Sequence, residues 1–172
     1  NNYDHYSNNS SLYVFMVLLK KKLIKKLTNK NLTISVVESC TGGLLSAEIT
    51  SVPNASKVFK MGLITYSNNS KNKLLKIPRQ VLLKYGAVSK FVCLLLVKNL
   101  AKISKANICV SITGIAGPSG GSKRKPVGLV YVGIKKGNRV EVKKYLFNNK
   151  GRSYIQKAAV NKSLGLILSF LK

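Results

Sequence analysis

Few residues of this chain could carry acid–base or nucleophilic chemistry. Among its 172 residues the only aspartate is Asp4 and the only histidine is His5, both in an Asn- and Ser-rich N-terminal stretch. A Ser-His-Asp triad needs a histidine in the folded body to move the proton, and a zinc enzyme needs clustered His, Cys or carboxylate ligands. A two-carboxylate glycosidase would have only Glu38, Glu48 and Glu141 to use. The composition excludes the first two chemistries and disfavours the third.

Ser39 and Cys40 are the candidate nucleophiles, because they lie between a predicted strand and a predicted helix. Without a histidine, lysine is the base type present in quantity, and it works as a base when its surroundings lower its pKa. Lys71 lies five residues after Tyr66, whose hydroxyl could relay or donate a proton. Spacing alone leaves two other interpretations open: Ser39 as a helix N-cap and Cys40 as a small core residue.

Two glycine-rich segments each follow a predicted strand. They are ESCTGG at 38–43 and TGIAGPSGG at 113–121. Ligands of open α/β sheets bind outside the carboxyl ends of strands, so the two loops should converge on one crevice. Glycines let a backbone approach a ligand closely, and free N–H groups at a helix start attract phosphate or an oxyanion. Neither segment fits a known phosphate fingerprint, and the alternative is a pair of tight turns without a ligand.

Hydrophobic patterning predicts strands that alternate with helices and then pair antiparallel at the end. This order indicates an α/β layered domain with a mixed sheet. Residues 1–11 are polar and are expected to be disordered, and one domain follows from 12 to 172. The predicted strands are 32–37, 63–66, 107–113, 127–134 and 140–147, and the predicted helices are 12 to about 28, 44–50, 78–85, 89–104 and 151–172.

The chain has a formal net charge of +26 from 30 basic and 4 acidic residues. Nucleic-acid binding would concentrate lysines on one face, whereas an AT-rich coding bias would scatter them. Lysines occur in nearly every segment, which favours coding bias. No apolar run reaches the roughly 18 residues of a membrane span. Three cysteines in unpaired spacings indicate reduced thiols, and therefore a cytoplasmic location.

Several motifs, in order, resemble the C-terminal domain of the CinA family. They are ESCTGG at 38–43, ITYSN at 64–68 with Lys71, GAVS at 86–89, TGIAGPSGG at 113–121 and KPVG at 125–128. The resemblance spans about residues 12–172. It implies a three-layer α/β/α sandwich, a homo-oligomer and a single amidohydrolase domain.

The resemblance also implies an activity: hydrolysis of nicotinamide mononucleotide to nicotinate mononucleotide and ammonia, in pyridine-nucleotide salvage, without a metal or organic cofactor. The nucleophilic serine of the family falls on Ser39, its tyrosine on Tyr66 and its lysine on Lys71. The expected mechanism has Lys71 take the Ser39 proton while Tyr66 orients or relays. The expected oxyanion and substrate-binding residues are Cys40, Thr41, Gly42, Gly43, Thr113, Gly114, Gly117 and, by charge, Arg152.

Some positions depart from the family pattern. Asn54 stands where glycine is usual, and Asn107 and Gln156 stand where aspartate and arginine are common. None of these departures removes the Ser39, Tyr66 and Lys71 set. Two alternatives remain: a basic nucleic-acid-binding module, and a family member that keeps the fold but has lost the reaction.

Overall fold

In the computed structural model, which describes residues 10–172, a five-stranded mixed sheet lies between two layers of helices. The strands are β1 (Ile34–Glu38), β2 (Phe59–Ile64), β3 (Ile108–Gly114), β4 (Leu129–Lys136) and β5 (Arg139–Leu146), and their order in the sheet is β2-β1-β3-β4-β5. β1 is parallel to its neighbours β2 and β3, and β4 is antiparallel to its neighbours β3 and β5. The predicted three-layer α/β fold is confirmed.

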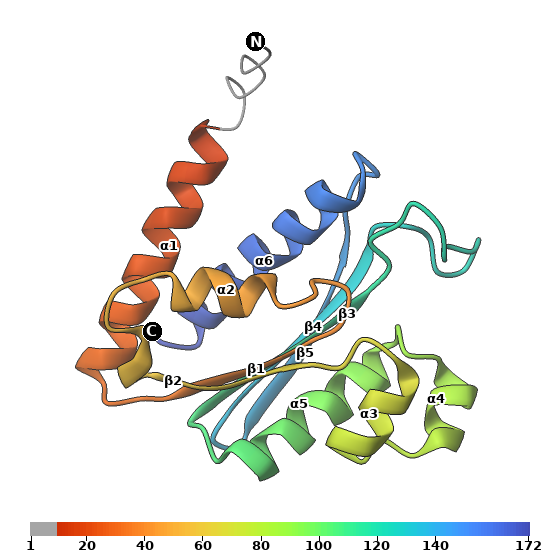
Figure 1. Ribbon diagram of the computed structural model, residues 1–172, viewed down its shortest axis with the longest axis horizontal. Helices are drawn as coiled ribbons and strands as arrows, with labels where there is room; N and C mark the ends of the chain where they lie inside the picture. Colours follow the sequence, from red (N-terminus) through yellow and green to blue (C-terminus); the bar gives the residue numbers. More distant parts are fainter. Residues whose placement is uncertain (1–9) are drawn as a thin grey trace.

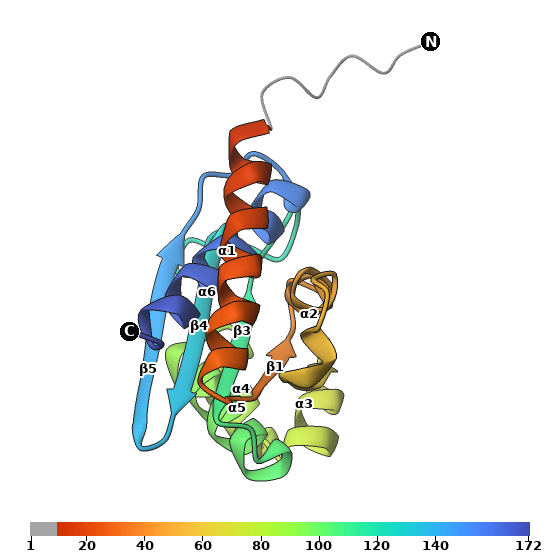
Figure 2. The same cartoon turned by 90° about the vertical axis from the view of Figure 1, so that its left-hand side faces the viewer.

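Helices cover both faces of the sheet (Figure 1). α1 (Ser10–Asn29), α2 (Leu44–Thr50) and α6 (Arg152–Ser169) lie on one face, and α3 (Asn68–Leu75), α4 (Arg79–Tyr85) and α5 (Lys90–Ser104) lie on the other. α1 packs on α6, as the turned view shows (Figure 2). Alternate residues of β1 enter the two cores: Val36 packs with the first three helices and Val37 with the other three.

All five residues of β1 are buried, as expected for a central strand with helices on both sides. Its last residue, Glu38, pairs with Ile64 at the end of β2 and with Ile112 near the end of β3. The chain segments that leave these three parallel strands therefore emerge side by side at one edge of the sheet. This register positions the first glycine-rich loop between the segment after β2 and the second glycine-rich loop.

The segment after β2 differs most from the sequence-based prediction. β2 begins at Phe59 rather than residue 63 and ends at Ile64, so Tyr66 lies beyond the strand. The polar stretch that follows is helix α3, which the prediction missed. Its N-cap is Ser67, whose hydroxyl accepts from the Ser70 N–H at 3.0 Å. Leu75 is the one fully buried apolar side chain of α3, and hydrophobic periodicity therefore did not predict the helix.

The remaining predicted elements are found with small shifts at their ends. Ser89 caps α5 as predicted, accepting from the Val92 N–H at 3.2 Å. α1 begins at Ser10, two residues before its predicted start, and residues 1–9, which make up most of the stretch predicted to be disordered, lie outside the described part of the chain. Asn54 has φ +68°, a left-handed conformation that glycine adopts freely and asparagine tolerates, so this departure is compatible with the fold.

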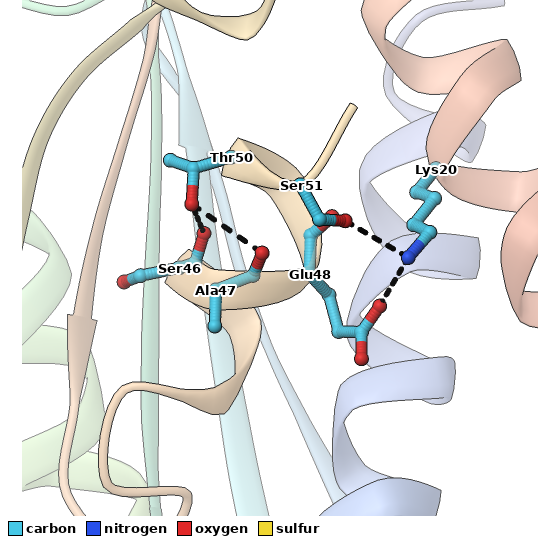
Figure 3. Close-up of polar contacts among 6 residues, drawn as sticks. All are labelled: Lys20, Ser46, Ala47, Glu48, Thr50 and Ser51. Atoms are coloured by element: carbon cyan, nitrogen blue, oxygen red, sulfur yellow. Dashed lines mark hydrogen bonds and ion pairs between the residues drawn. The ribbon is translucent and has the colours of Figure 1, made fainter. Parts of the chain in front are cut away.

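α2 is tied to α1 by a polar contact (Figure 3). The Lys20 ammonium lies 2.6 Å from a Glu48 carboxylate oxygen and donates to the Ser51 hydroxyl at 2.9 Å. Leu45 and Ile49 of α2 are buried in the core. The short helix is thereby fixed between α1 and the sheet. No helix among residues 10–172 combines the length and the apolar character needed to cross a membrane.

Candidate active site

Ser39 is the first residue after β1, and its position is set by the sheet. Its N–H donates to the Ile112 carbonyl at 3.0 Å, so the parallel pairing of β1 and β3 continues one residue past the strand. Its hydroxyl oxygen lies 3.0 Å from Lys71 Nζ. The N-cap interpretation of Ser39 is wrong, because the N-cap residue of α2 is Gly43. The serine is 8% exposed, which leaves its hydroxyl at the inner end of the site.

Lys71 is the largest buried polar side chain of the site, with an exposed fraction of 1%. Besides Ser39, its ammonium contacts the backbone carbonyls of Thr65 at 2.6 Å and Tyr66 at 3.4 Å. No carboxylate faces it in these contacts. Burial removes water from the charged form and lowers the pKa of Lys71 from 10.5 to about 8, against a smaller opposing effect of Cys40. About a tenth of this lysine is therefore a neutral amine at pH 7, and about half of it at pH 8.

Cys40 is adjacent to Ser39 but has a different character. Its side chain is buried, and burial raises the pKa of the thiol to about 12. A thiol with this pKa has almost no thiolate at neutral pH and is a poor nucleophile. Of the two candidate nucleophiles, only Ser39 has its reactive atom in hydrogen-bond contact with Lys71. All three cysteines of the chain are free and buried.

The Glu38 carboxylate holds the first glycine-rich loop from inside. It is fully buried and forms no ion pair with any residue that the structure describes, but it accepts five hydrogen bonds. Their donors are the Thr41 hydroxyl at 2.6 Å, the Gly43 N–H at 3.2 Å, the Leu45 N–H at 3.0 Å, and the Ser46 N–H and hydroxyl at 2.8 and 2.7 Å. Negative charge at the start of α2 is favoured by the helix dipole. The carboxylate ties the loop to the helix.

These contacts separate the four predicted oxyanion residues into two pairs. The N–H of Gly42 donates to the Ser39 carbonyl at 3.1 Å, and that of Gly43 donates to Glu38. Among the described residues, the N–H groups of Cys40 and Thr41 have no acceptor on another residue. Cys40 and Thr41 are therefore the loop residues whose amides are available to a ligand, while the two glycines provide the positive φ angles of +60° and +102° that the turn requires.

Tyr66 lies at the site, but its hydroxyl does not contact Lys71 or Ser39 as expected for a proton relay. Instead Arg152 Nη2 donates to the Tyr66 hydroxyl at 2.8 Å, and Nη1 of the same arginine donates to the Gly117 carbonyl at 2.8 Å. Tyr66 is 60% exposed. One guanidinium at the start of α6 thus joins the segment after β2 to the second glycine-rich loop.

The other predicted residues of the second loop have structural contacts. The Thr113 hydroxyl is buried and donates to the Ala87 carbonyl at 2.9 Å. Gly114 pairs with Val130 in the sheet, and a Cβ there would lie 2.7 Å from the Leu129 carbonyl. Only Gly117 of the three has a contact that reaches the site, through Arg152.

Two residues that hold the site were not selected as site residues from the sequence. Glu38 could have been found as an acidic residue near the start of a predicted helix, where a carboxylate satisfies free N–H groups. Gln156, which the sequence marked only as a departure, donates from Nε2 to the Cys40 carbonyl at 2.9 Å. It lies four residues after Arg152, on the same face of α6. No local pattern points to that contact, which joins residues 116 apart.

Residues 17–171 match the family model described as the CinA C-terminal domain. A CinA-like protein of Prochlorococcus marinus (strain AS9601) is 47% identical over 155 residues, which cover 87% of this chain and 37% of that protein. The chain thus spans about a third of the length of the curated relatives it matches.

Solved structures agree with this result. The crystal structure of the competence/damage inducible protein CihA from Agrobacterium tumefaciens has a TM-score of 0.89 and 34% identity, covering 92% of this chain and 96% of that one. A competence or damage-inducible protein from Enterobacter asburiae has a TM-score of 0.87 and 30% identity, covering 91% and 98%.

Proposed function

Because the chain belongs to the CinA C-terminal domain family, we propose that it hydrolyses the carboxamide of nicotinamide mononucleotide, with nicotinate mononucleotide and ammonia as products. The observation that carries this proposal is the 3.0 Å contact between Ser39 Oγ and Lys71 Nζ in a buried site. A serine paired with a desolvated lysine is the arrangement of an acyl-transfer enzyme that works without histidine.

Lys71 has the contacts that a neutral amine can satisfy. An –NH₂ group has two N–H donors and one lone pair, and Lys71 Nζ has three partners. The carbonyls of Thr65 and Tyr66 can only accept, so they take the two N–H groups. The lone pair then faces the Ser39 hydroxyl and accepts its proton. The two carbonyls orient the amine for this transfer in the way that a carboxylate orients the histidine of a triad.

The reaction then proceeds through an acyl-serine. Ser39 Oγ attacks the carboxamide carbon as its proton moves to Lys71, and the carbonyl oxygen becomes an oxyanion held by backbone N–H groups of the first loop. Lys71 returns the proton to the departing nitrogen, which leaves as ammonia. Water, deprotonated by the same lysine, cleaves the ester and releases the carboxylate product. Ser39 is restored, and the steps require no metal or organic cofactor.

Arg152 is the proposed group that recognises the substrate phosphate. Its guanidinium lies at the mouth of the site, exposed and without a carboxylate partner in the described structure. Arginine binds phosphate oxygens in a bidentate manner. Tyr66, whose hydroxyl it contacts, offers an exposed aromatic ring beside it for the nucleotide. Exchange of Arg152 for alanine should raise KM by about tenfold or more and change kcat little.

Two alternatives to this proposal are a nucleic-acid-binding module and a family member that has lost the reaction. Nucleic-acid binding predicts basic residues on one face. Lysines or arginines instead occur on β2, β4, β5 and every α-helix except α2, and so on both faces of the sheet. This distribution favours coding bias as the origin of the charge. The assembled contact between Ser39 and Lys71 favours an active enzyme over a degenerate relative.

Ammonia release from nicotinamide mononucleotide tests the proposal. We expect the purified protein to release ammonia and form nicotinate mononucleotide in equal amounts, and we expect Ser39→Ala and Lys71→Ala to abolish both. No release by well-folded wild-type protein would refute the function. Release that persists in both variants would refute the mechanism while keeping the activity.

A further inference from the structure

We infer that Gln156 is a positioning residue that turns the Thr41 N–H into an oxyanion donor, together with the Cys40 N–H. The inference rests on Ser39 acting as the nucleophile, as proposed above, but not on the identity of the substrate. In the first loop, the N–H groups of Cys40 and Thr41 have no acceptor on another described residue.

Each of these amides belongs to a peptide group whose carbonyl is already held. The Ser39 carbonyl accepts from the Gly42 N–H at 3.1 Å, and the Cys40 carbonyl accepts from Gln156 Nε2 at 2.9 Å. A trans peptide is planar, and its N–H points opposite to its C=O. The two carbonyl contacts therefore direct the N–H groups of Cys40 and Thr41 away from Gly42 and Gln156.

The two amides depend on different parts of the molecule. The contact that orients the Cys40 N–H is local, since Gly42 belongs to the same turn, and Glu38 holds that turn through Thr41 Oγ and the Gly43 N–H. The contact that orients the Thr41 N–H comes from α6. The segment of α6 that bears Gln156 is held in place, because Ile155 and Ala159 are fully buried in the core to which α2 also contributes. Gln156 is thus a rigid outside support for one of two donors.

Labelling of Ser39 by a fluorophosphonate tests the inference without a nucleotide substrate. Ser39 Oγ forms a bond to phosphorus, fluoride leaves, and Lys71 takes the hydroxyl proton, while the phosphoryl oxygen needs the same donors as an oxyanion. Gln156→Met keeps the length of the side chain and removes its donor. We expect labelling at least about tenfold slower than in the wild type, because loss of an oxyanion donor costs about 10²–10³ and this change misplaces one.

Matched variants separate positioning from general damage. Lys157→Met adds the same residue at the next, exposed position of α6 and should label within about twofold of the wild type. Gln156→Lys restores a donor and should recover most of the rate. Gln156→Asn shortens the side chain by one methylene and so moves the amide out of reach of the Cys40 carbonyl. Its rate of labelling should therefore be as low as that of Gln156→Met. This second variant provides the test if the methionine variant folds poorly. The pH midpoint of labelling should stay at the wild-type value, because Lys71 is not altered.

The outcomes are distinct. Slow labelling of Gln156→Met with an unchanged pH midpoint and rescue by lysine supports the inference. Labelling at the wild-type rate, a shifted midpoint, or wild-type protein that is not labelled at Ser39 overturns it. Wild-type protein that is labelled at Ser39 but releases no ammonia from nicotinamide mononucleotide refutes the proposed function alone, and the role of Gln156 is still decided by the labelling rates.

Discussion

The two glycine-rich loops leave neighbouring strands of one sheet but are held in different ways. In the first, residues 38–43, the buried Glu38 carboxylate accepts five hydrogen bonds, and Ser39 is tied to β3. In the second, residues 118–124 are exposed, and the loop projects beyond the sheet (Figure 1). It is joined to its surroundings through Arg152 at Gly117 and through Lys125 Nζ, which donates to the Tyr85 carbonyl at 2.7 Å.

This difference matches two demands of catalysis. A nucleophile and its oxyanion donors must be held within a fraction of an ångström, so their loop is satisfied by contacts inside the protein. A loop that closes on a ligand must be able to move, and exposed backbone with few contacts allows that. Changes in the first loop should therefore lower kcat or the rate of Ser39 labelling, and changes in the second should act on KM or have little effect.

The largest effect is expected from Lys71→Met. It should reduce activity by about 10⁴-fold or more, because the one base that contacts Ser39 within residues 10–172 is lost. It should also raise the free energy of unfolding at pH 7 by about 1–3 kcal/mol, because the buried ammonium opposes folding. Lys73→Met, at an exposed position of the same helix, is the control.

The sign of the stability effect follows from the lowered pKa of Lys71. Between pH 8 and 10.5 the unfolded chain binds more protons at this residue than the folded chain, so wild-type stability rises with pH in this window. In denaturant unfolding, the amount by which the free energy of unfolding of Lys71→Met exceeds that of the wild type should be largest below pH 8 and should shrink towards pH 10.5. A variant less stable than the wild type at pH 7 would contradict the assignment of a buried, destabilising lysine.

Glu38→Gln tests whether the first loop is held by its internal carboxylate. The new NH₂ group would face donors only, so we expect a loss of about 3 kcal/mol in the free energy of unfolding and about a 10²-fold loss in the rate of Ser39 labelling. Glu48→Gln, on the helix α2 that follows the first loop and in a partly exposed pair with Lys20, should cost less than about 1 kcal/mol. Equal losses for the two variants would show that Glu38 has no special role.

The pH dependence of kcat/KM should report Lys71 in the free enzyme. Activity requires the neutral amine, so it should rise with pH and level off above about 8, the pKa of Lys71. The rise from pH 7 to pH 8 should be about fivefold, because the neutral fraction grows from about a tenth to about half. A profile that is flat from pH 6 to 8 would exclude Lys71 as the base.

The smallest effects should come from one glycine in each loop. Gly43 and Gly120 both have positive φ, +102° and +87°, so alanine should cost each about 1 kcal/mol of stability. A Cβ on Gly43 would lie 2.9 Å from Ile64 Cδ1, whereas one on Gly120 would meet nothing closer than 3.9 Å. Labelling of Ser39 should slow several-fold in Gly43→Ala and change less than twofold in Gly120→Ala. The reverse order would mean that the second loop holds the reacting groups.

Local signals in the sequence were enough to predict most of the fold. Short runs of β-branched residues, the Ser89 cap and the turn between β4 and β5 depend on neighbouring residues, so their elements were found. Helix α3 was missed because its sequence is polar and it is stabilised by the Ser67 cap and by packing on α5. The error mattered, because α3 is the element that carries Lys71 into the core.

The sequence by itself determined the types of group available for chemistry. With no histidine in residues 10–172, lysine was the base type present in quantity to serve a serine after a central strand, and the two glycine-rich loops were expected to meet at the carboxyl ends of parallel strands. Tertiary structure alone decided how the remaining side chains were used: Tyr66 contacts Arg152 rather than Lys71, and Gln156 supports Cys40. These contacts join residues 86 and 116 positions apart, and they exist because α6 packs beside α2 over the end of the sheet. No local pattern encodes that packing, since it depends on how complete elements fit together.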